Sequence, residues 1–310
     1  MNHLINPIFQ DETKAREWLE ARVWPDGPFC PHCGVQDFTR LEGKAHRPGL
    51  YQCNACRQQF TVTVGTLFER SKIPLTKWLM ATFLLSASKK GMSTHQLHRM
   101  LGISYKSTWF MMHRIREAMR EINPEPLGGT GKIIEADETV IGGKERNKRL
   151  SKRNPKNIGA VGKEIAFSLV ERGGKVRSHH VPNVSAKTLR PILVAQVDRK
   201  SVLMTDDAGQ YRSVGLEFAG FHTVNHGIEE YVRGEAHTNT IEGYFSILKR
   251  GINGTYHHVS QAHLKRYLCE FDFRYNFRNV DDLTRAESAA KGIAGKRLTY
   301  RRTDRREARA

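Results

Sequence analysis

The chain has 310 residues, with 50 lysines and arginines against 32 aspartates and glutamates, a net charge of +18 and a pI near 9.9. This length allows two or three domains, and the charge favours a polyanionic partner, above all nucleic acid, because neutralised phosphates release counterions. No apolar run reaches the length of a membrane span and no signal peptide opens the sequence, so we expect no membrane association and a cytoplasmic location. An anionic membrane surface, or a merely basic protein of the ribosome, are the alternatives.

Two cysteine pairs lie near the N-terminus, in "FCPHCG" and "YQCNACRQQF". They supply Cys30, Cys33, Cys53 and Cys56, and each pair has two intervening residues, as in two zinc knuckles. Four thiolates complete a tetrahedral shell and leave no position open for water, so the zinc would be structural. The sequence therefore predicts a zinc ribbon within residues 1–70. A redox dithiol would need only one such pair.

A helical segment is expected in residues 71–128. One helix covers residues 75–88, a second begins at Ser93 or Thr94, and a third is capped by Ser104, with Gly102 allowing the bend between the last two. This pattern is typical of a helix-turn-helix module, whose second helix reads the major groove of DNA. An ordinary helical bundle with a solvated side is the alternative. The side chains that we expect on the exposed, DNA-reading side are Lys106, Ser107, His113 and Arg114.

The third region, residues 129–285, follows a linker rich in proline and glycine at residues 123–132. Its expected order is a strand, a hairpin turning at Gly173-Gly174, a helix capped by Ser185, an apolar strand ending in "TDD", and then helices. That order suits a mixed sheet with helices on its faces, as in ribonuclease H-like domains. Residues 286–310 are basic and poor in apolar side chains, so we expect a tail. The predicted fold class is therefore α+β with several domains.

Three acidic residues of this region lie on separate expected elements. Asp137 is on the first strand, Asp206 ends the last strand, and Glu242 is on the helix "HTNTIEGYFSILKRG". Phosphoryl transfer with two divalent ions needs acidic oxygens that converge in this way, and Mg²⁺ or Mn²⁺ is the expected metal. Lys249 lies two helical turns after Glu242 and points the same way, toward a phosphate. Asp207 is an alternative to Asp206.

Two acids beside Asp137 are weaker candidates for the metal site. Glu138 points to the opposite face of the strand and is not expected to be a ligand. Glu135 shares the face of Asp137 and could substitute for it. After this strand, residues 144–157, "KERNKRLSKRNPKN", form a basic loop that either contacts the DNA backbone or is simply solvated.

These motifs, together with "GTYHHVSQAHLKRYLCEFDFRYNFR", resemble the DDE-type transposases of bacterial insertion sequences, in particular the ISXO-like group with an N-terminal zinc ribbon. The resemblance covers residues 20–280. It implies a ribonuclease H-like catalytic domain, cutting of double-stranded DNA at terminal inverted repeats, joining of the 3′ ends to target DNA, and homo-oligomers on paired ends in the bacterial nucleoid.

The resemblance leaves the third metal ligand open between Asn239 and Glu242, which lie three residues apart on one helical face. We favour Glu242 because its charge suits Mg²⁺, and Asn239 could ligate or orient it. Lys249 and Arg250 are expected to contact DNA. A regulator derived from a transposase, or a nuclease or resolvase of the same fold, are the alternative functions.

Overall fold

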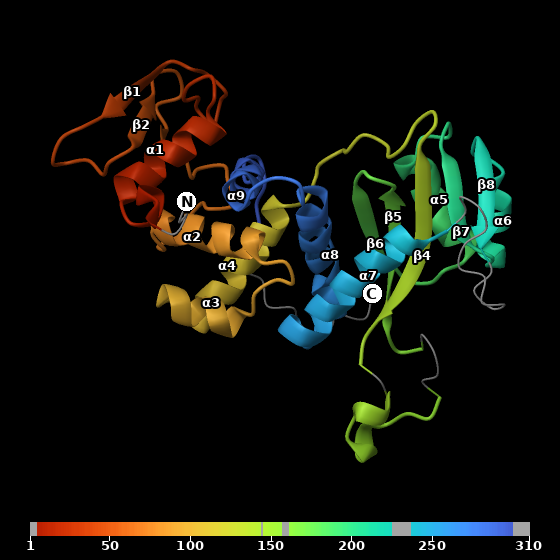
Figure 1. The fold of residues 1–310 in the computed structure, drawn as a ribbon. Helices are drawn as coiled ribbons and strands as arrows, with labels where there is room; N and C mark the ends of the chain where they lie inside the picture. The colour runs from red at the N-terminus through yellow and green to blue at the C-terminus, as the bar shows by residue number, and fades with distance from the viewer. Residues whose placement is uncertain (1–4, 144, 157–160, 225–236, 300–310) are drawn as a thin grey trace. The chain divides into compact units, whose positions relative to one another are not determined.

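The protein is described here by a computed structural model that covers residues 5–143, 145–156, 161–224 and 237–299 (Figure 1). The chain divides into two compact units. The first combines Met1–Arg120 with Phe277–Ala310, and the second is Glu121–Asn276. The chain thus returns to the first unit at residue 277, whereas the sequence suggested a catalytic region to residue 285 and a tail from residue 286.

The first unit holds a small sheet and several helices. The sheet has the order β1-β2-β3 with antiparallel pairs. The described elements are η2 (Pro7–Phe9), α1 (Glu12–Val23), β1 (Phe38–Leu41), β2 (Leu50–Cys53), β3 (Gln59–Phe60), α2 (Leu75–Ala87), α3 (Thr94–Leu101), α4 (Tyr105–Ala118) and α9 (Asp282–Lys291).

Helices α3 and α4 begin where the sequence predicts them. The Ser93 side chain accepts a hydrogen bond from the Gln96 backbone N–H, and Ser104 accepts one from Ser107 in the same way. Between the helices, Gly102 adopts a left-handed conformation (φ 61°), which a residue without a Cβ adopts without strain. The two helices therefore start and stop on local signals.

The C-terminal segment returns to α4 and completes this unit. Lys296 is buried, and its ammonium donates to the backbone carbonyls of Glu117, Ala118 and Arg120 at 2.6–3.1 Å. These carbonyls lie at the C-terminal end of α4, where backbone carbonyls have no N–H donor within the helix and a positive charge is favourable. The segment after residue 286 is thus part of the fold as far as it is described.

The second unit is built on a five-stranded sheet. Its described elements are β4 (Ile133–Ile141), η3 (Glu145–Asn147), η4 (Leu150–Lys152), β5 (Glu164–Glu171), β6 (Val176–Val181), α5 (Ala186–Gln196), β7 (Val202–Asp206), α6 (Gly209–Gly215), β8 (Gly220–Val224), α7 (Asn239–Gly251), the π-helical η6 (Ile252–Tyr256) and α8 (Gln261–Asn276).

The strand order is β6-β5-β4-β7-β8, so β4 is the central strand. Strands β4, β5 and β6 pair antiparallel, while β7 and β8 run parallel to β4. Helices α7 and α8 share a core with one face, which includes Val170, Tyr244 and Phe271. Helices α5 and α6 share a core with the other, which includes Phe167 and Leu203. The unit is a three-layer mixed α/β structure (Figure 1).

Two elements of this unit lie where the sequence showed only irregular chain. These are α6 and β8, which complete the parallel half of the sheet. None of the helices in the part of the chain that the structure describes has the length and the apolar character needed to cross a bilayer.

Candidate functional site

Asp137 lies in the middle of β4, and Asp206 is the last residue of the neighbouring parallel strand β7. The pairing of β4 with β7 extends to Glu135 and Met204, and the same register continued by two residues would set Asp137 beside Asp206. Neighbouring strands lie about 5 Å apart, so the two carboxylates emerge next to each other. Two strands thus bring together acids that are far apart in sequence.

Helix α7 brings the third acid to the same face of the sheet. Its buried stripe, from Ile241 to Leu248, packs into the core beneath α7 and α8, and its exposed stripe carries the polar side chains. The exposed stripe contains Asn239, Glu242, Lys249 and Arg250. Since each helical residue rises about 1.5 Å, Lys249 lies about 10 Å along the axis from Glu242.

The electrostatics of Asp137 connect the three acids. Burial raises the pKa of this carboxyl to about 7, and the negative charges of Glu138, Asp206 and Glu242 add to the rise. A hydrogen bond of 2.7 Å from the Glu138 backbone N–H to Asp137 Oδ1 acts in the opposite direction. Asp206 and Glu242 are therefore close enough to disfavour the ionisation of Asp137, as at a site that takes up cationic charge.

The three acids nevertheless form a loose group. Among the described residues, three or more ligand atoms of His, Cys, Asp or Glu lie within 4.8 Å of one another at the cysteine cluster alone. The oxygens of Asp137, Asp206 and Glu242 are more widely spread than that. Two ions about 3.5–4 Å apart span a wider set of oxygens than one ion does.

The two neighbouring acids, Glu138 and Asp207, are engaged elsewhere. Glu138 points to the opposite face, where it accepts hydrogen bonds from the Tyr211 hydroxyl and, at 3.1 Å, from the Gln210 amide of α6. Asp207 is exposed and lies 3.4 Å from the Arg212 guanidinium. Glu138 therefore secures α6, and Asp207 points to solvent.

Glu135, which the sequence suggested as a substitute ligand, is fully buried and forms an ion pair with Arg172 at 2.7 Å. Its oxygens also accept hydrogen bonds from the start of α7. Because its oxygens already accept these bonds, the Glu135 carboxylate links β4 to the start of α7 and is not a metal ligand. Sequence reasoning missed this role because Glu135 shares the face of Asp137.

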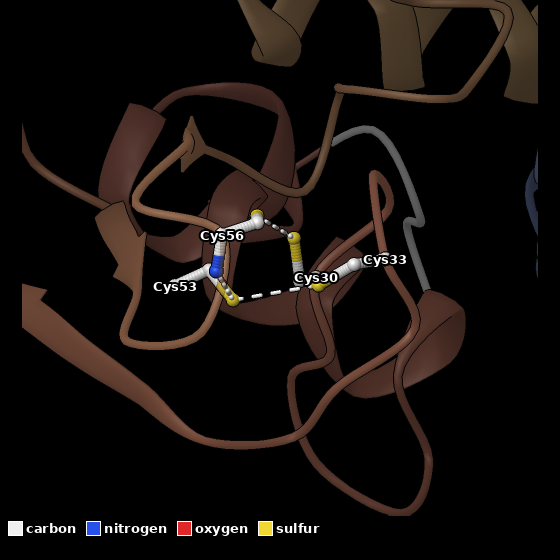
Figure 2. A group of neighbouring side chains, drawn as sticks. All are labelled: Cys30, Cys33, Cys53 and Cys56. Atoms are coloured by element: carbon white, nitrogen blue, oxygen red, sulfur yellow. Dashed lines mark hydrogen bonds between the residues drawn. The ribbon is translucent and has the colours of Figure 1, made fainter.

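The four N-terminal cysteines converge between the loop at residues 30–33 and the end of β2 (Figure 2). Their Sγ atoms lie within 4.8 Å of one another, with Cys30–Cys56 and Cys33–Cys53 both at 3.6 Å. Disulfide sulfurs lie about 2 Å apart, whereas four thiolates around zinc, with bonds of about 2.3 Å, lie about 3.8 Å apart. The cluster therefore fits one tetrahedral zinc ion.

The expected DNA-reading side of α4 differs from the structure. Lys106 and Ser107 are exposed in the first turn, but His113 is 1% exposed and packs against Trp109 with ring centroids 4.2 Å apart. Arg114 is half-buried and donates to the Glu69 backbone carbonyl. The expectation that His113 and Arg114 lie on an exposed face is wrong, because α4 packs against α2, α3 and α9 after its first turn.

The surface that remains exposed around α4 includes part of α3. There His95, Arg99 and Met100 are exposed, and the His95 ring lies 4.5 Å from that of Tyr105 at the start of α4. The sequence pattern of α3 contained this signal, since its buried positions are Leu97 and Leu101.

The basic loop between β4 and β5 has an internal frame where it is described. The Arg153 guanidinium donates to the backbone carbonyls of Lys148 and Arg146, and the Glu145 carboxylate accepts the Asn154 backbone N–H. Its exposed basic residues are Arg146, Lys148, Arg149, Arg153 and Lys156. Lys144 and Asn157 lie outside the described residues.

Comparison with known proteins assigns both parts of the chain. Residues 126–276 match the ISXO2-like transposase domain, and residues 10–59 match the transposase zinc-ribbon domain. The first match spans the elements from β4 to α8, and the second includes all four cysteines. The chain is therefore a transposase with a zinc ribbon.

A relative from Halobacterium salinarum agrees with this class. It is described as an uncharacterized protein in transposable element ISH50, and it is 28% identical over 276 residues, which cover 86% of this chain and 91% of that protein. Residues 126–276 therefore form an ISXO2-like transposase domain beside a transposase zinc ribbon, and the resemblance in the sequence is confirmed.

The zinc assignment predicts a stable metal content that depends on the cluster. Purified protein should contain one zinc per chain by elemental analysis, and Cys53→Ser should lose it together with the cooperative unfolding of the ribbon, because zinc binding supplies its folding free energy. Cys269→Ser, outside the cluster, should keep the zinc. Full zinc content in Cys53→Ser would contradict the assignment.

The raised pKa of Asp137 predicts how stability changes with pH when no divalent ion is added. The pKa of Asp137 is about 7 in the folded state, against an ordinary aspartate pKa of 3.8, so the folded state binds more protons between these values. The free energy of unfolding therefore falls as the pH rises through this window. Asp137→Asn should remove this loss and raise stability at about pH 8 by on the order of 1 kcal/mol.

Chemical denaturation across this pH range, with the structural zinc retained, provides the measurement. Asp207→Asn is the matched control, since that acid is exposed beside the site, and it should follow the parent profile. A parent profile that parallels Asp137→Asn throughout would contradict the raised pKa.

Proposed function

We propose that this protein cuts DNA at the terminal inverted repeats of an insertion sequence and joins the freed 3′ ends to target DNA. The reaction would be phosphoryl transfer assisted by two Mg²⁺ or Mn²⁺ ions. The observation that carries the proposal is that Asp137 of β4 and Asp206, the last residue of the adjacent parallel strand β7, lie on the sheet face covered by the helix of Glu242, within the matched transposase domain. A ribonuclease H-like fold belongs to the same proposal, and the strand order and mixed pairing support it.

The acidic residues fit such ions. Carboxylate oxygens are the hard ligands that Mg²⁺ prefers, and three of them from separate elements leave room for retained waters and substrate oxygens. Burial and neighbouring charge raise the pKa of Asp137 to about 7, a penalty that a bound cation would offset. When bound, two ions stabilise the attacking and the leaving oxygen of an in-line displacement.

The side chains of the protein would act by holding the DNA in place. Asp137 and Asp206 would hold the reacting phosphodiester against the end of the sheet, through the ions that they ligate. Lys249, exposed and about 10 Å further along α7, would bind a phosphate beyond the scissile one, and Arg250 would contact the next stretch of DNA backbone. Lys249 would therefore position substrate, since its distance along the helix separates it from the two metal ions.

We assign the third ligand to Glu242. Asp137 is sensitive to the charge of Glu242, and the Thr238 hydroxyl donates to Glu242 Oε1 at 3.3 Å, which orients the carboxylate. Asn239 lies on the same exposed stripe, one turn earlier, at the first position of α7. Its amide would orient substrate or metal-bound solvent from that position.

The same proposal includes how DNA is held. The exposed first turn of α4, with Lys106 and Ser107, and the neighbouring face of α3 would contact the terminal repeat. The basic loop between β4 and β5 would contact phosphates, because its exposed side chains are cationic and its backbone is internally hydrogen-bonded. A homo-oligomer would hold the two ends together.

Strand cleavage and joining with the purified chain test the proposal. A duplex that carries the terminal inverted repeat and its flank, with Mg²⁺, should yield a nicked end and then a joined product. Asp137→Ala, Asp206→Ala and Glu242→Ala should each lose about 100-fold or more in both steps, and Asn239→Ala should lose less. Asp207→Ala is the matched control and should retain activity.

Each failure has a distinct meaning. Cleavage by Asp137→Ala at the parent rate would remove the carboxylates from catalysis. Nicked ends without joined product would indicate a nuclease or resolvase, and retained repeat binding without cleavage would indicate a regulator. An Asn239→Ala variant as inactive as Glu242→Ala would make the amide an equal member of the site.

A further inference from the structure

We propose that the buried Glu135–Arg172 ion pair is a positioning device that sets the three metal-binding carboxylates in register. The proposal rests on the function proposed above. The pair contacts each of the three elements that carry an acid: β4 with Asp137, β7 with Asp206, and the start of α7 with Glu242. Neither residue is a ligand; both act through residues that neighbour the three acids on the same elements.

Glu135 secures the N-terminal end of α7. Its Oε2 accepts the Ile241 backbone N–H at 2.9 Å, and its Oε1 accepts the Thr240 hydroxyl at 3.0 Å. The residue that precedes the helix, Thr238, provides no side-chain cap of its own. A carboxylate from the central strand therefore satisfies a donor that the helix leaves open, where negative charge is favourable. Glu242 is the next residue after Ile241.

Arg172, which follows β5, extends this connection. Its Nε donates to Glu135 Oε1 at 2.7 Å, and one terminal nitrogen lies 2.7 Å from the His237 backbone carbonyl and 2.9 Å from Met204 Sδ. His237 precedes α7, and Met204 is the β7 partner of Glu135 in the strand register. The planar guanidinium can reach three elements at once, which the single ammonium of lysine cannot.

The ion pair lies where it can influence the positions of the proposed metal ligands. Glu135 and Met204 lie two residues before Asp137 and Asp206 on adjacent strands, so each acid shares a sheet face with an anchored residue about 7 Å away. Burying charge is costly unless the charge is paired and hydrogen-bonded, and here the pair also bonds to Met204 of β7, to His237 before α7 and to the start of α7. A stability role alone would not require the pair to stand at this register.

The test measures Mn²⁺ binding to the zinc-loaded full chain by the resonance signal of free Mn²⁺, together with the thermal unfolding midpoint. Glu135→Gln should weaken Mn²⁺ binding about tenfold or more, because residues that orient ligands affect metal affinity by that factor. Arg172→Lys should do the same. Thr240→Val removes one hydrogen bond from Glu135 at nearly equal volume, and it should weaken binding about threefold with little change in the midpoint.

The matched control is Glu270→Gln. Glu270 is also fully buried; it forms an ion pair with Arg274 in α8 and accepts a hydrogen bond from the Tyr256 hydroxyl of η6. It should lower the unfolding midpoint as Glu135→Gln does and leave Mn²⁺ binding unchanged. Asp137→Ala provides the reference for a lost site.

The inference would be overturned if Thr240→Val and a folded variant of the pair, either Glu135→Gln or Arg172→Lys, both kept a Mn²⁺ affinity within twofold of the parent. The proposed function would then remain in place. Equal weakening in Glu270→Gln would also overturn it, since loss of stability would then explain the effect. Mn²⁺ binding unaffected by Asp137→Ala would instead remove the proposed metal site, and with it the basis of this inference.

Discussion

The alternation of side chains along β4 is the constraint on which the second unit depends. This strand is central in the sheet and helices cover both faces of the sheet, so each side chain of β4 points into one helical layer or the other. Glu135 and Asp137 face α7, while Ala136 and Glu138 face the layer of α5 and α6. A shift of one residue in the pairing with β7 would exchange these faces and separate the acids. The site therefore depends directly on the register of β4 and β7.

A site of this kind opposes stability locally. Carboxylates near one another and partly out of water raise one another's pKa, as that of Asp137 shows, and the surrounding contacts must hold them in place. One such contact lies across the α7–α8 face, where Asp272 accepts hydrogen bonds from Ser178 of β6 and from the Tyr244 hydroxyl of α7. Burial raises the pKa of Asp272 to about 6. Helix α7 is therefore fastened to the sheet both near its start and along its length.

Local signals in the sequence were sufficient for several parts of the structure. The cysteine spacing predicts the cluster because zinc geometry depends on those few atoms, and the serine caps predict α3 and α4 because capping involves residues within one turn. Alternation along β4 also separates Glu138 from Asp137 as expected. These features need no knowledge of distant contacts.

The missed features depend on such contacts. Lys296 closes the end of α4 from a segment that reads as a basic tail, and β8 is a short strand whose place is given by pairing with β7. The sequence pattern placed His113 on the exposed side of α4, but α4 packs against α2, α3 and α9 and His113 is buried. The sequence alone suggests Glu135 as a substitute ligand, and its contacts with Arg172 and the start of α7 become visible only in the structure. Chains of this kind reveal their ligands more readily than the residues that orient them.

The central claim is that Asp137, Asp206 and Glu242 form one divalent-metal site at the end of the β4–β7 pair. Crystals of the zinc-loaded protein soaked in Mn²⁺ and measured at the manganese absorption edge test it most directly. The account predicts anomalous density at two positions about 3.5–4 Å apart, bounded by these three carboxylates, in addition to the zinc among the four cysteines. Manganese bound elsewhere, with no density between Asp137 and Asp206, would contradict it.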